Sequence, residues 1–298
     1  MEIRQRLIKI FSPAKINLFL AITGRRKDGF HNLHSLFSHI DLYDRILIDM
    51  DLDGPSSCKI VSTGIFYKIA LDKTNTMARA VDIIRKLTGF DGSININIHK
   101  EIPPYSGLGG GSSNGTHVFL SLLRTLGHSM AKTEILKHLA KIGSDCPFFS
   151  KNTPQLVSGR GEILTDLGKS YVAKIRNLKF AVFKPKFDIN TAWAYAQMAN
   201  GYTDEAKANE LLAKFLHNLE MGKHSPIYND FNSLVFERHL ELKNLKKTLA
   251  DRGFYMSLTG SGSACLVHLN SHADWHSISA LIKAKLGQDI FIRSVTCM

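Results

Sequence analysis

A glycine-rich stretch contains the residue types that most directly indicate chemistry in this sequence. Residues 102–114 read IPPYSGLGGGSSN and combine four glycines with three serines. The glycines at 107, 109, 110 and 111 permit positive φ angles and a close approach of the backbone to a ligand. Ser112 and Ser113 stand where a hydroxyl can cap a helix, bind a phosphate or reach Mg²⁺.

The segments on either side place this stretch between a strand and a helix. Before it, SININIHKEI alternates Ile94, Ile96 and Ile98 with polar residues, a pattern typical of a half-buried strand. After it, apolar residues recur at helical spacing: Val118, Phe119, Leu122, Leu123 and Leu126. A loop at a helix N-terminus presents free backbone N–H groups and the positive end of the helix dipole, so we expect it to bind phosphate.

Two familiar phosphate-binding loops do not fit the spacing. A Walker A loop needs a lysine after its last glycine, and none follows Gly111. The dinucleotide pattern GxGxxG fails because Ser112 stands at its third glycine position. On this stretch alone, a tight turn without a ligand stays an alternative.

The composition is that of a folded protein with room for two domains. The chain has 298 residues, of which 44% are hydrophobic and 21% charged, and it lacks an apolar run long enough to span a membrane. Its four cysteines form no CxxC pair, so neither a disulfide framework nor a zinc site is expected, and a reducing, cytoplasmic location is favoured.

The formal charge of +12 is compatible with nucleic acid, anionic lipid or a polyanionic small molecule. Lysines and arginines are scattered through the chain without basic runs or aromatic-flanked clusters. We therefore expect a small-molecule partner, and neither nucleic acid nor a membrane.

The remaining patterns predict helices and strands that do not alternate regularly. The apolar N-terminal region predicts a first strand, and a glycine-serine turn joins two predicted strands within residues 254–269. A further strand is expected at 178–185, and helices are expected at 74–89, 132–143, 191–199, 204–220 and 241–253. This mixture favours an α+β fold.

Four motifs occur in a characteristic order: SPAKINLFLAITGRRKDGFH from residue 12, IPPYSGLGGGSSN from 102, GSDCPFF from 143 and SLTGSGSACLV from 257. In order and approximate spacing they resemble the kinases of the galactokinase, homoserine kinase, mevalonate kinase and phosphomevalonate kinase superfamily. The resemblance covers about Ser12 to Leu269. It implies a two-domain kinase fold, with an ATP-binding domain at 1–155, a substrate-binding domain at 156–298 and the active site in the cleft between them.

Within the superfamily, PAKINLFL, GFH, GSDCPFF and the GRGE at 159–162 are most similar to members that act on a substrate bearing a cytidine diphosphate group. This resemblance implies ATP-dependent, Mg²⁺-assisted phosphorylation of the 2-hydroxyl of 4-diphosphocytidyl-2-C-methyl-D-erythritol, in the non-mevalonate isoprenoid pathway. Two alternatives stay open. The chain could be another alcohol kinase, similar to mevalonate or homoserine kinase, or a non-catalytic nucleotide or RNA binder on a related fold.

Lys15 and Asp145 match the catalytic pair of the superfamily. Phosphoryl transfer to an alcohol needs a carboxylate that accepts the hydroxyl proton and cations that offset the charge of the transferred oxygens. A nearby Lys15 would also keep Asp145 ionised. From the residues alone, Asp145 could equally cap a short helix, and Lys15 could be a surface lysine.

The resemblance also implies a set of nucleotide-binding residues. The phosphates of ATP would lie along Gly107, Leu108, Gly109, Gly110, Gly111, Ser112 and Ser113. Asn75 and Lys100 would lie near the nucleotide, although a helix cap and a solvated strand-end lysine are their ordinary alternatives. Mg²⁺ would arrive with ATP and contact Ser112 or Ser113, without a dedicated site on the protein.

The resemblance likewise implies a set of substrate-binding residues. Relatives stack the cytosine between aromatic rings and read its edge with a histidine, which here correspond to Phe30, Tyr195 and His31. Phe30 keeps the stacking face but lacks the phenolic hydroxyl of the tyrosine that relatives carry. Substrate contacts are also expected from Asn17 and from the second glycine turn at Gly260, Ser261 and Gly262, for which a plain hairpin turn is the alternative. A last departure is at Tyr105 and Ser106, where relatives carry small residues.

Overall fold

The computed structural model describes residues 5–66, 68–198, 201–223 and 225–298. They form two units, and strands β1 (Gln5–Arg25) and β2 (His31–Asp51) contribute to both. Unit 1 contains residues up to 14, 42–104 and 109–152, and unit 2 contains residues 15–41, 105–108 and those from 153 onward. The units are thus interleaved along the chain. The expected boundary at residue 155, with ATP binding before it and substrate binding after it, stays a prediction.

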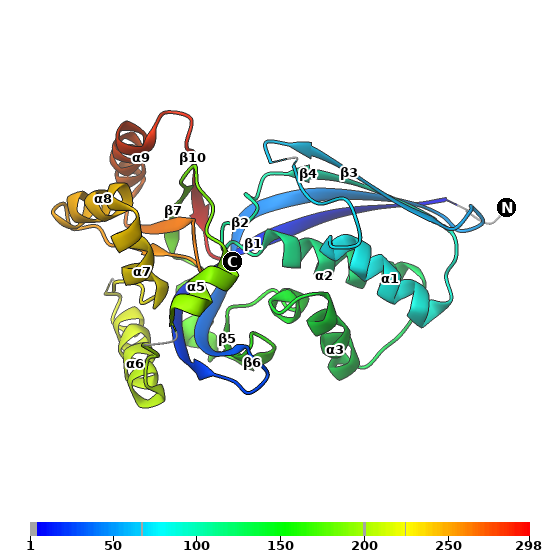
Figure 1. Ribbon diagram of the computed structural model, residues 1–298, viewed down its shortest axis with the longest axis horizontal. Helices are drawn as coiled ribbons and strands as arrows, with labels where there is room; N and C mark the ends of the chain where they lie inside the picture. The colour runs from blue at the N-terminus through cyan, green and yellow to red at the C-terminus, as the bar shows by residue number, and fades with distance from the viewer. Residues whose placement is uncertain (1–4, 67, 199–200, 224) are drawn as a thin grey trace. The chain divides into compact units, whose positions relative to one another are not determined.

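Unit 1 packs helices against one face of a sheet (Figure 1). Strand β4 pairs antiparallel with β2 and parallel with β3. Its Ile94, Ile96 and Ile98 are at most 1% exposed, which confirms the half-buried strand that the alternation predicts. The elements of this unit, besides β1 and β2, are β3 (Ser57–Gly64), α1 (Thr76–Thr88), β4 (Ser93–Lys100), α2 (Gly110–Thr125), α3 (Lys132–Ile142) and the 3₁₀ helix η1 (Cys146–Ser150).

The two helices beside the glycine loop begin differently. Helix α1 is capped by Asn75, whose Oδ1 accepts a hydrogen bond of 2.8 Å from the Met77 amide, and it ends at Gly89 with φ 70°. Helix α2 follows Gly109, which also has φ 70° and supplies no side-chain cap. Because α2 begins at Gly110, Ser112 lies inside its first turn and does not cap it.

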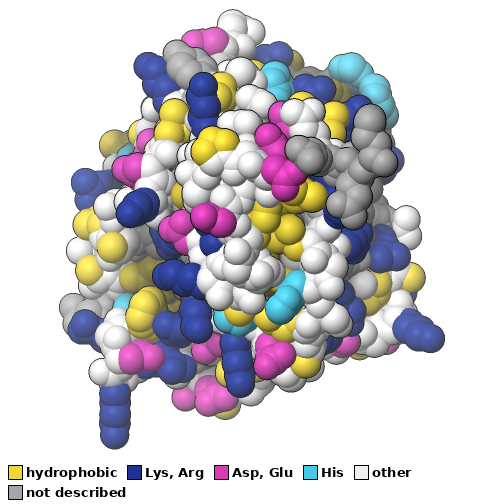
Figure 2. Space-filling model, turned by 90° about the vertical axis from the view of Figure 1, so that its right-hand side faces the viewer, with side chains coloured by type: hydrophobic (Ala, Val, Ile, Leu, Met, Phe, Trp, Pro, Cys, Tyr) yellow, Lys and Arg dark blue, Asp and Glu magenta, His cyan; other side chains and the backbone are white. Residues whose placement is uncertain are grey.

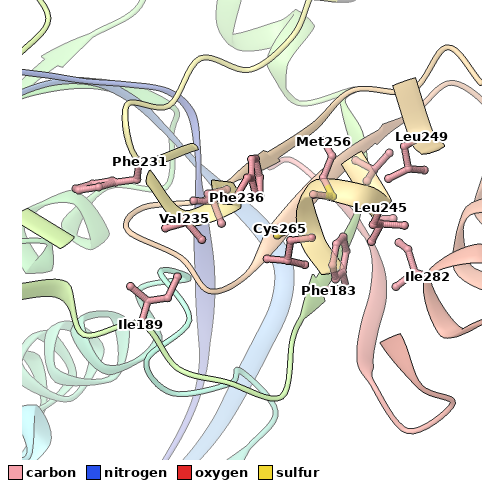
Figure 3. Close-up of a cluster of buried hydrophobic side chains, with 14 of the residues drawn as sticks. Phe183, Ile189, Phe231, Val235, Phe236, Leu245, Leu249, Met256, Cys265 and Ile282 are labelled. Carbon is pink, nitrogen blue, oxygen red and sulfur yellow. The ribbon is translucent and has the colours of Figure 1, made fainter. Parts of the chain in front are cut away.

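Unit 2 contains the second sheet, which is antiparallel and has the strand order β10-β7-β9-β8. Side chains from these strands and from the helices that cover them form one buried cluster, in which Phe183, Leu245 and Ile282 lie together (Figure 3). The elements are β5 (Gln155–Gly159), β6 (Ile163–Asp166), α4 (Lys169–Ile175), β7 (Lys179–Lys184), α5 (Thr191–Gln197), α6 (Glu205–Glu220), α7 (Phe231–Arg238), α8 (Leu240–Ala250), β8 (Met256–Leu258), β9 (Cys265–Leu269), α9 (His272–Leu286) and β10 (Phe291–Thr296).

Most elements expected from the sequence are present, and their irregular order confirms the α+β class. Strands β8 and β9 flank the predicted glycine-serine turn, and the predicted helices correspond to α1, α3, α5, α6 and α8. The expected segment at 191–199 forms α5, which ends at Gln197, and Ala199 lies outside the described residues.

Charged side chains of both signs are intermixed on the surface. On the face drawn in Figure 2, Lys and Arg side chains stand singly or in small groups with acidic side chains between them. A helix with the length and hydropathy of a membrane span does not occur among the described residues.

Two leucines of α8 test the buried cluster of unit 2. Leu245 is 1% exposed, whereas Leu240, on the same helix, is 65% exposed. Leu245→Ala should lower the free energy of unfolding by about 2–5 kcal/mol, because it opens a cavity in the cluster. Leu240→Ala should change it by less than about 0.5 kcal/mol in the same urea titration. Equal losses for the two variants would contradict this description of the core.

Candidate active site

The start of α2 is tied to a buried carboxylate that the sequence analysis did not single out. Asp44, on β2, is 0% exposed. Its Oδ1 accepts hydrogen bonds of 2.9 Å from the amides of Glu101 and Ile102, and its Oδ2 accepts one of 2.9 Å from Asn114 Nδ2. Oδ2 also forms an ion pair with Lys100. The end of β4 and the first turns of α2 are therefore held by one side chain.

Lys100 is a buried cation beneath the glycine loop. It is 3% exposed, and its burial lowers the pKa of the ammonium group while Asp44 opposes that shift. Its Nζ lies 3.4 Å from the position that a Cβ on Gly110 would occupy. These observations exclude a solvated strand-end lysine and place a positive charge under the first turn of α2. Its contact with a nucleotide stays a prediction.

The glycines of the α2 start differ in what surrounds them. A Cβ on Gly110 would stand 2.9 Å from Ile102 Cγ2, and one on Gly115 would stand 2.8 Å from Thr76 Cβ. Close packing within the unit thus requires both glycines. At Gly111 the nearest atom to such a Cβ is Thr76 Oγ1, at 4.0 Å. The backbone at Gly111 is therefore accessible to a ligand.

The two serines of the loop have unlike surroundings. Ser113 is 0% exposed, and its hydroxyl accepts a hydrogen bond of 2.7 Å from Ser12. Ser112 is half-buried, and its side chain hydrogen-bonds with the Cys146 thiol. Of the pair, Ser112 has the more accessible hydroxyl.

Asp145 is held beside the same helix start. The Thr116 hydroxyl donates a hydrogen bond of 2.9 Å to the Cys146 carbonyl, and the Cys146 thiol lies 3.5 Å from the Ser112 carbonyl. Asp145 precedes η1 but makes no side-chain cap, which excludes the capping role. Burial raises the pKa of the Cys146 thiol to about 12, so this neighbour of Asp145 carries no charge near neutral pH.

In unit 2, Lys15 is fixed by neighbours that leave it almost no exposure. It is 3% exposed, its Nζ donates a 2.7 Å hydrogen bond to Asn17 Oδ1, and it lies 4.5 Å from the centre of the Phe37 ring. Asn17 Nδ2 in turn donates to Ser35 Oγ at 3.0 Å. Lys15 is therefore no surface lysine. The Asn17 side chain positions Lys15, and its expected contact with substrate stays a prediction.

The two glycine turns of unit 2 meet backbone to backbone. A Cβ on Gly107 would lie 2.0 Å from the Thr259 carbonyl oxygen, and one on Gly260 would lie 3.2 Å from Gly107 Cα. Both glycines have positive φ, as does Tyr105 at 53°. The turn at 260–262 is thus packed against the loop entry and is more than a plain hairpin turn. A positive φ strains a tyrosine but not a glycine, so Tyr105 holds a backbone conformation that a glycine would adopt more easily.

The aromatic residues assigned to the base lie together in unit 2. The His31 and Tyr195 rings are 5.0 Å apart, and Tyr202 places its hydroxyl 3.3 Å from His31 Nε2. Burial, followed by the charge of Arg25, lowers the pKa of His31, which is therefore neutral at pH 7. Phe30 is 48% exposed, and the Arg160 guanidinium lies 4.8 Å from its ring centre.

The structure thus groups the expected residues within each unit. Asn75, Lys100, Gly109–Ser113 and Asp145 belong to unit 1, and the other expected site residues belong to unit 2. The sequence analysis did not single out Asp44, Tyr202 or Thr259 as parts of the site. Their partners are distant in sequence, and although Lys100, Ile102 and Asn114 lie in or beside the quoted stretch, no local pattern connects them with Asp44. No three His, Cys, Asp or Glu side chains in the described ranges are grouped to hold a metal ion.

Comparisons with known proteins agree on one group of enzymes. Residues 75–152 match the model of the GHMP kinases N terminal domain. The chain is 34% identical to a 4-diphosphocytidyl-2-C-methyl-D-erythritol kinase of Methylacidiphilum infernorum, over 96% of this chain and 95% of the relative. It is 35% identical to a chloroplastic enzyme of the same name from Oryza sativa, over 86% of this chain but 63% of the relative.

A solved structure of the same kind of enzyme shares the fold. The crystal structure of a 4-(cytidine 5'-diphospho)-2C-methyl-D-erythritol kinase superposes with a TM-score of 0.75 at 25% identity, and the match covers 97% of this chain and 99% of that one. The kinase fold expected from the motifs is confirmed.

Two aspartates of β2 test the anchor of the α2 start. Asp44→Asn leaves Lys100 buried without its counter-ion and should lower the free energy of unfolding by about 3–5 kcal/mol. The half-buried Asp49, five residues along the strand, is the control, and Asp49→Asn should cost less than about 0.5 kcal/mol. Adding Lys100→Met to Asp44→Asn should restore part of the loss in a urea titration, since the unpaired charge is removed. A double variant no more stable than Asp44→Asn would disprove the charge pairing.

Proposed function

Because this chain belongs to the family of 4-diphosphocytidyl-2-C-methyl-D-erythritol kinases, a branch of the GHMP kinases, we propose that it transfers the terminal phosphate of ATP to the 2-hydroxyl of 4-diphosphocytidyl-2-C-methyl-D-erythritol. The protein is a kinase, and the identity of 34% that runs through 96% of its length is the observation that carries the proposed substrate. In a cell the reaction would supply the non-mevalonate isoprenoid pathway. A cytoplasmic location stays part of this proposal.

The phosphates of ATP would bind along the glycine loop. The first amides of α2 are free of intrahelical partners, and the helix dipole adds positive potential there, while the charge of the buried Lys100 is balanced by Asp44. The accessible backbone at Gly111 supports a close approach of phosphate oxygens. Gly107 and Leu108 would extend this binding surface along the loop entry.

Asp145 would act on the acceptor. Its carboxylate would accept or orient the proton of the 2-hydroxyl as that oxygen attacks phosphorus. Lys15 would offset the negative charge on the transferred oxygens, since its ammonium group is fixed by Asn17 and carries a positive charge. The contacts of Lys15 with Asn17 and Phe37 favour such a positioning role for the lysine.

Mg²⁺ fits as a companion of ATP. Ser112 has a half-buried hydroxyl that would turn from the Cys146 thiol to the ion, whereas the fully buried Ser113 hydroxyl is occupied by Ser12. When bound with the nucleotide, Mg²⁺ would supply positive charge to the phosphate oxygens. Asn75, whose side chain already caps α1, would contribute by fixing that helix beside the loop.

The cytosine would bind at the aromatic cluster around His31. Phe30 offers an exposed ring for stacking, and Arg160 holds that ring from its other side. Neutral His31 has one donor and one acceptor nitrogen, which suits the edge of a cytosine. The Tyr195 ring packs on His31, and its centre lies 5.1 Å from that of Phe231. Tyr195 would therefore position the histidine as well as contact the base.

The proposal is tested by the choice of acceptor. Purified protein with Mg²⁺ and ATP should release ADP when 4-diphosphocytidyl-2-C-methyl-D-erythritol is added. Mevalonate and homoserine, which carry no cytidine for the His31 cluster, should give a kcat/KM lower by at least about 100-fold. Turnover of either control without turnover of the cytidine compound would remove the proposed substrate, and RNA binding without any turnover would favour the non-catalytic alternative.

Asp145→Asn tests the catalytic role directly. The amide keeps the shape but accepts no proton, so kcat should fall by about 10²–10⁴-fold while the Kd for both substrates changes little. Asp91→Asn, at an exposed position of the same unit, is the matched control and should leave kcat unchanged. The role would be refuted by an Asp145→Asn enzyme with wild-type turnover in the ADP-release assay.

A further inference from the structure

Unit 2 contains a cavity that none of the expected site residues lines. Its volume is about 490 Å³, within the range of small-molecule sites. One face of α6, the segment 225–230, the first turn of α7 and Lys246 of α8 form its wall. The cavity is therefore separate from the residues assigned to ATP and to cytidine.

Two lysines give the cavity its charge. Lys214 of α6 and Lys246 of α8 both line it, and neither forms an ion pair with a carboxylate among the described residues. The Lys246 Nζ lies 4.8 Å from the centre of the Phe236 ring, and burial lowers the pKa of its ammonium group. A partly desolvated cation without a counter-ion favours an anionic ligand.

The acidic residue of the wall does not neutralise these lysines. Asp230 accepts hydrogen bonds of 2.6 Å from the Ile22 amide and 2.6 Å from the Tyr228 hydroxyl. The Thr203 hydroxyl donates to it as well, at 2.8 Å. Its carboxylate oxygens are thus directed to fixed partners in the protein, and because the wall carries two lysines against this one carboxylate, one net positive charge is left over.

Leu211, Phe215 and Ile227 supply an apolar part of the wall, beside asparagine and serine side chains. From this combination we propose that the cavity binds a small organic anion, one carboxylate or phosphate group attached to an apolar body. The anionic group pairs with Lys214 and Lys246, and the apolar body packs against α6.

The ligand would contact the residues that hold the second glycine turn. Asn229 lines the cavity, is 4% exposed, and donates hydrogen bonds to the carbonyls of Leu258 at 3.0 Å and Gly260 at 2.9 Å. Asn232, also in the wall, accepts a 2.9 Å hydrogen bond from the Leu258 amide. Occupation of the cavity therefore restrains these side chains and, through them, the turn at Gly260.

Calorimetric titration of the full chain tests the site with three probes: 3-phenylpropionate, phenyl phosphate and the neutral 3-phenylpropanol. At least one anion should bind wild type at least about tenfold more tightly than the alcohol, and the better anion shows which head group the site prefers. Lys246→Met and Lys214→Met should each weaken the binding of that anion by about tenfold or more. Lys243→Met, at an exposed position of α8, should not.

Two further readouts keep the test decisive. Lys246→Arg keeps the charge and should retain binding, which separates loss of charge from loss of folding. The Leu258 amide donates a hydrogen bond to Asn232 Oδ1. Bound anion should slow the hydrogen exchange of this amide by at least threefold. Equal binding of anions and alcohol, or anion binding that survives both lysine-to-methionine changes, would overturn the proposal.

Discussion

The carboxylate of Asp44 is the constraint on which the start of α2 and the glycine loop depend. A charge with no exposure to water is tolerated only when its oxygens are fully paired, and Asp44 obtains its partners from the end of β4 and from α2. A shift of either end of the glycine loop would leave part of this charge unpaired. Asp44 therefore fixes both ends of a loop that is rich in glycine.

The same principle organises unit 2 around a buried cation. Lys15 is held by Asn17, and Asn17 by Ser35 and Thr259, so a chain of short-range contacts links the first motif to the second glycine turn. Asn229 supports that turn from its other side. The buried charges of both units are thus supported by polar side chains whose hydrogen bonds are internal, and the cost of burying them is offset by their mutual pairing.

Periodicity and turn chemistry predicted the local structure well. The alternation of Ile94, Ile96 and Ile98 identified β4, and Asn75 and Gly89 identified the ends of α1, because each signal lies in neighbouring residues. Asp44 could not be found in this way. It is one of several acidic residues in its part of the chain, and its partners lie more than fifty residues away. The grouping of His31 with Tyr202 is likewise a tertiary contact without a local pattern.

The glycines of the two turns set different limits on how this protein can be engineered. Gly107 and Gly260 approach each other through their backbones at positive φ, so a side chain at either position would be strained, most severely at Gly107. At Gly111 the nearest atom to an added Cβ is Thr76 Oγ1, at an ordinary contact distance of 4.0 Å, and φ is not positive. Side chains introduced at that single position would change the surface of the loop and leave its framework intact.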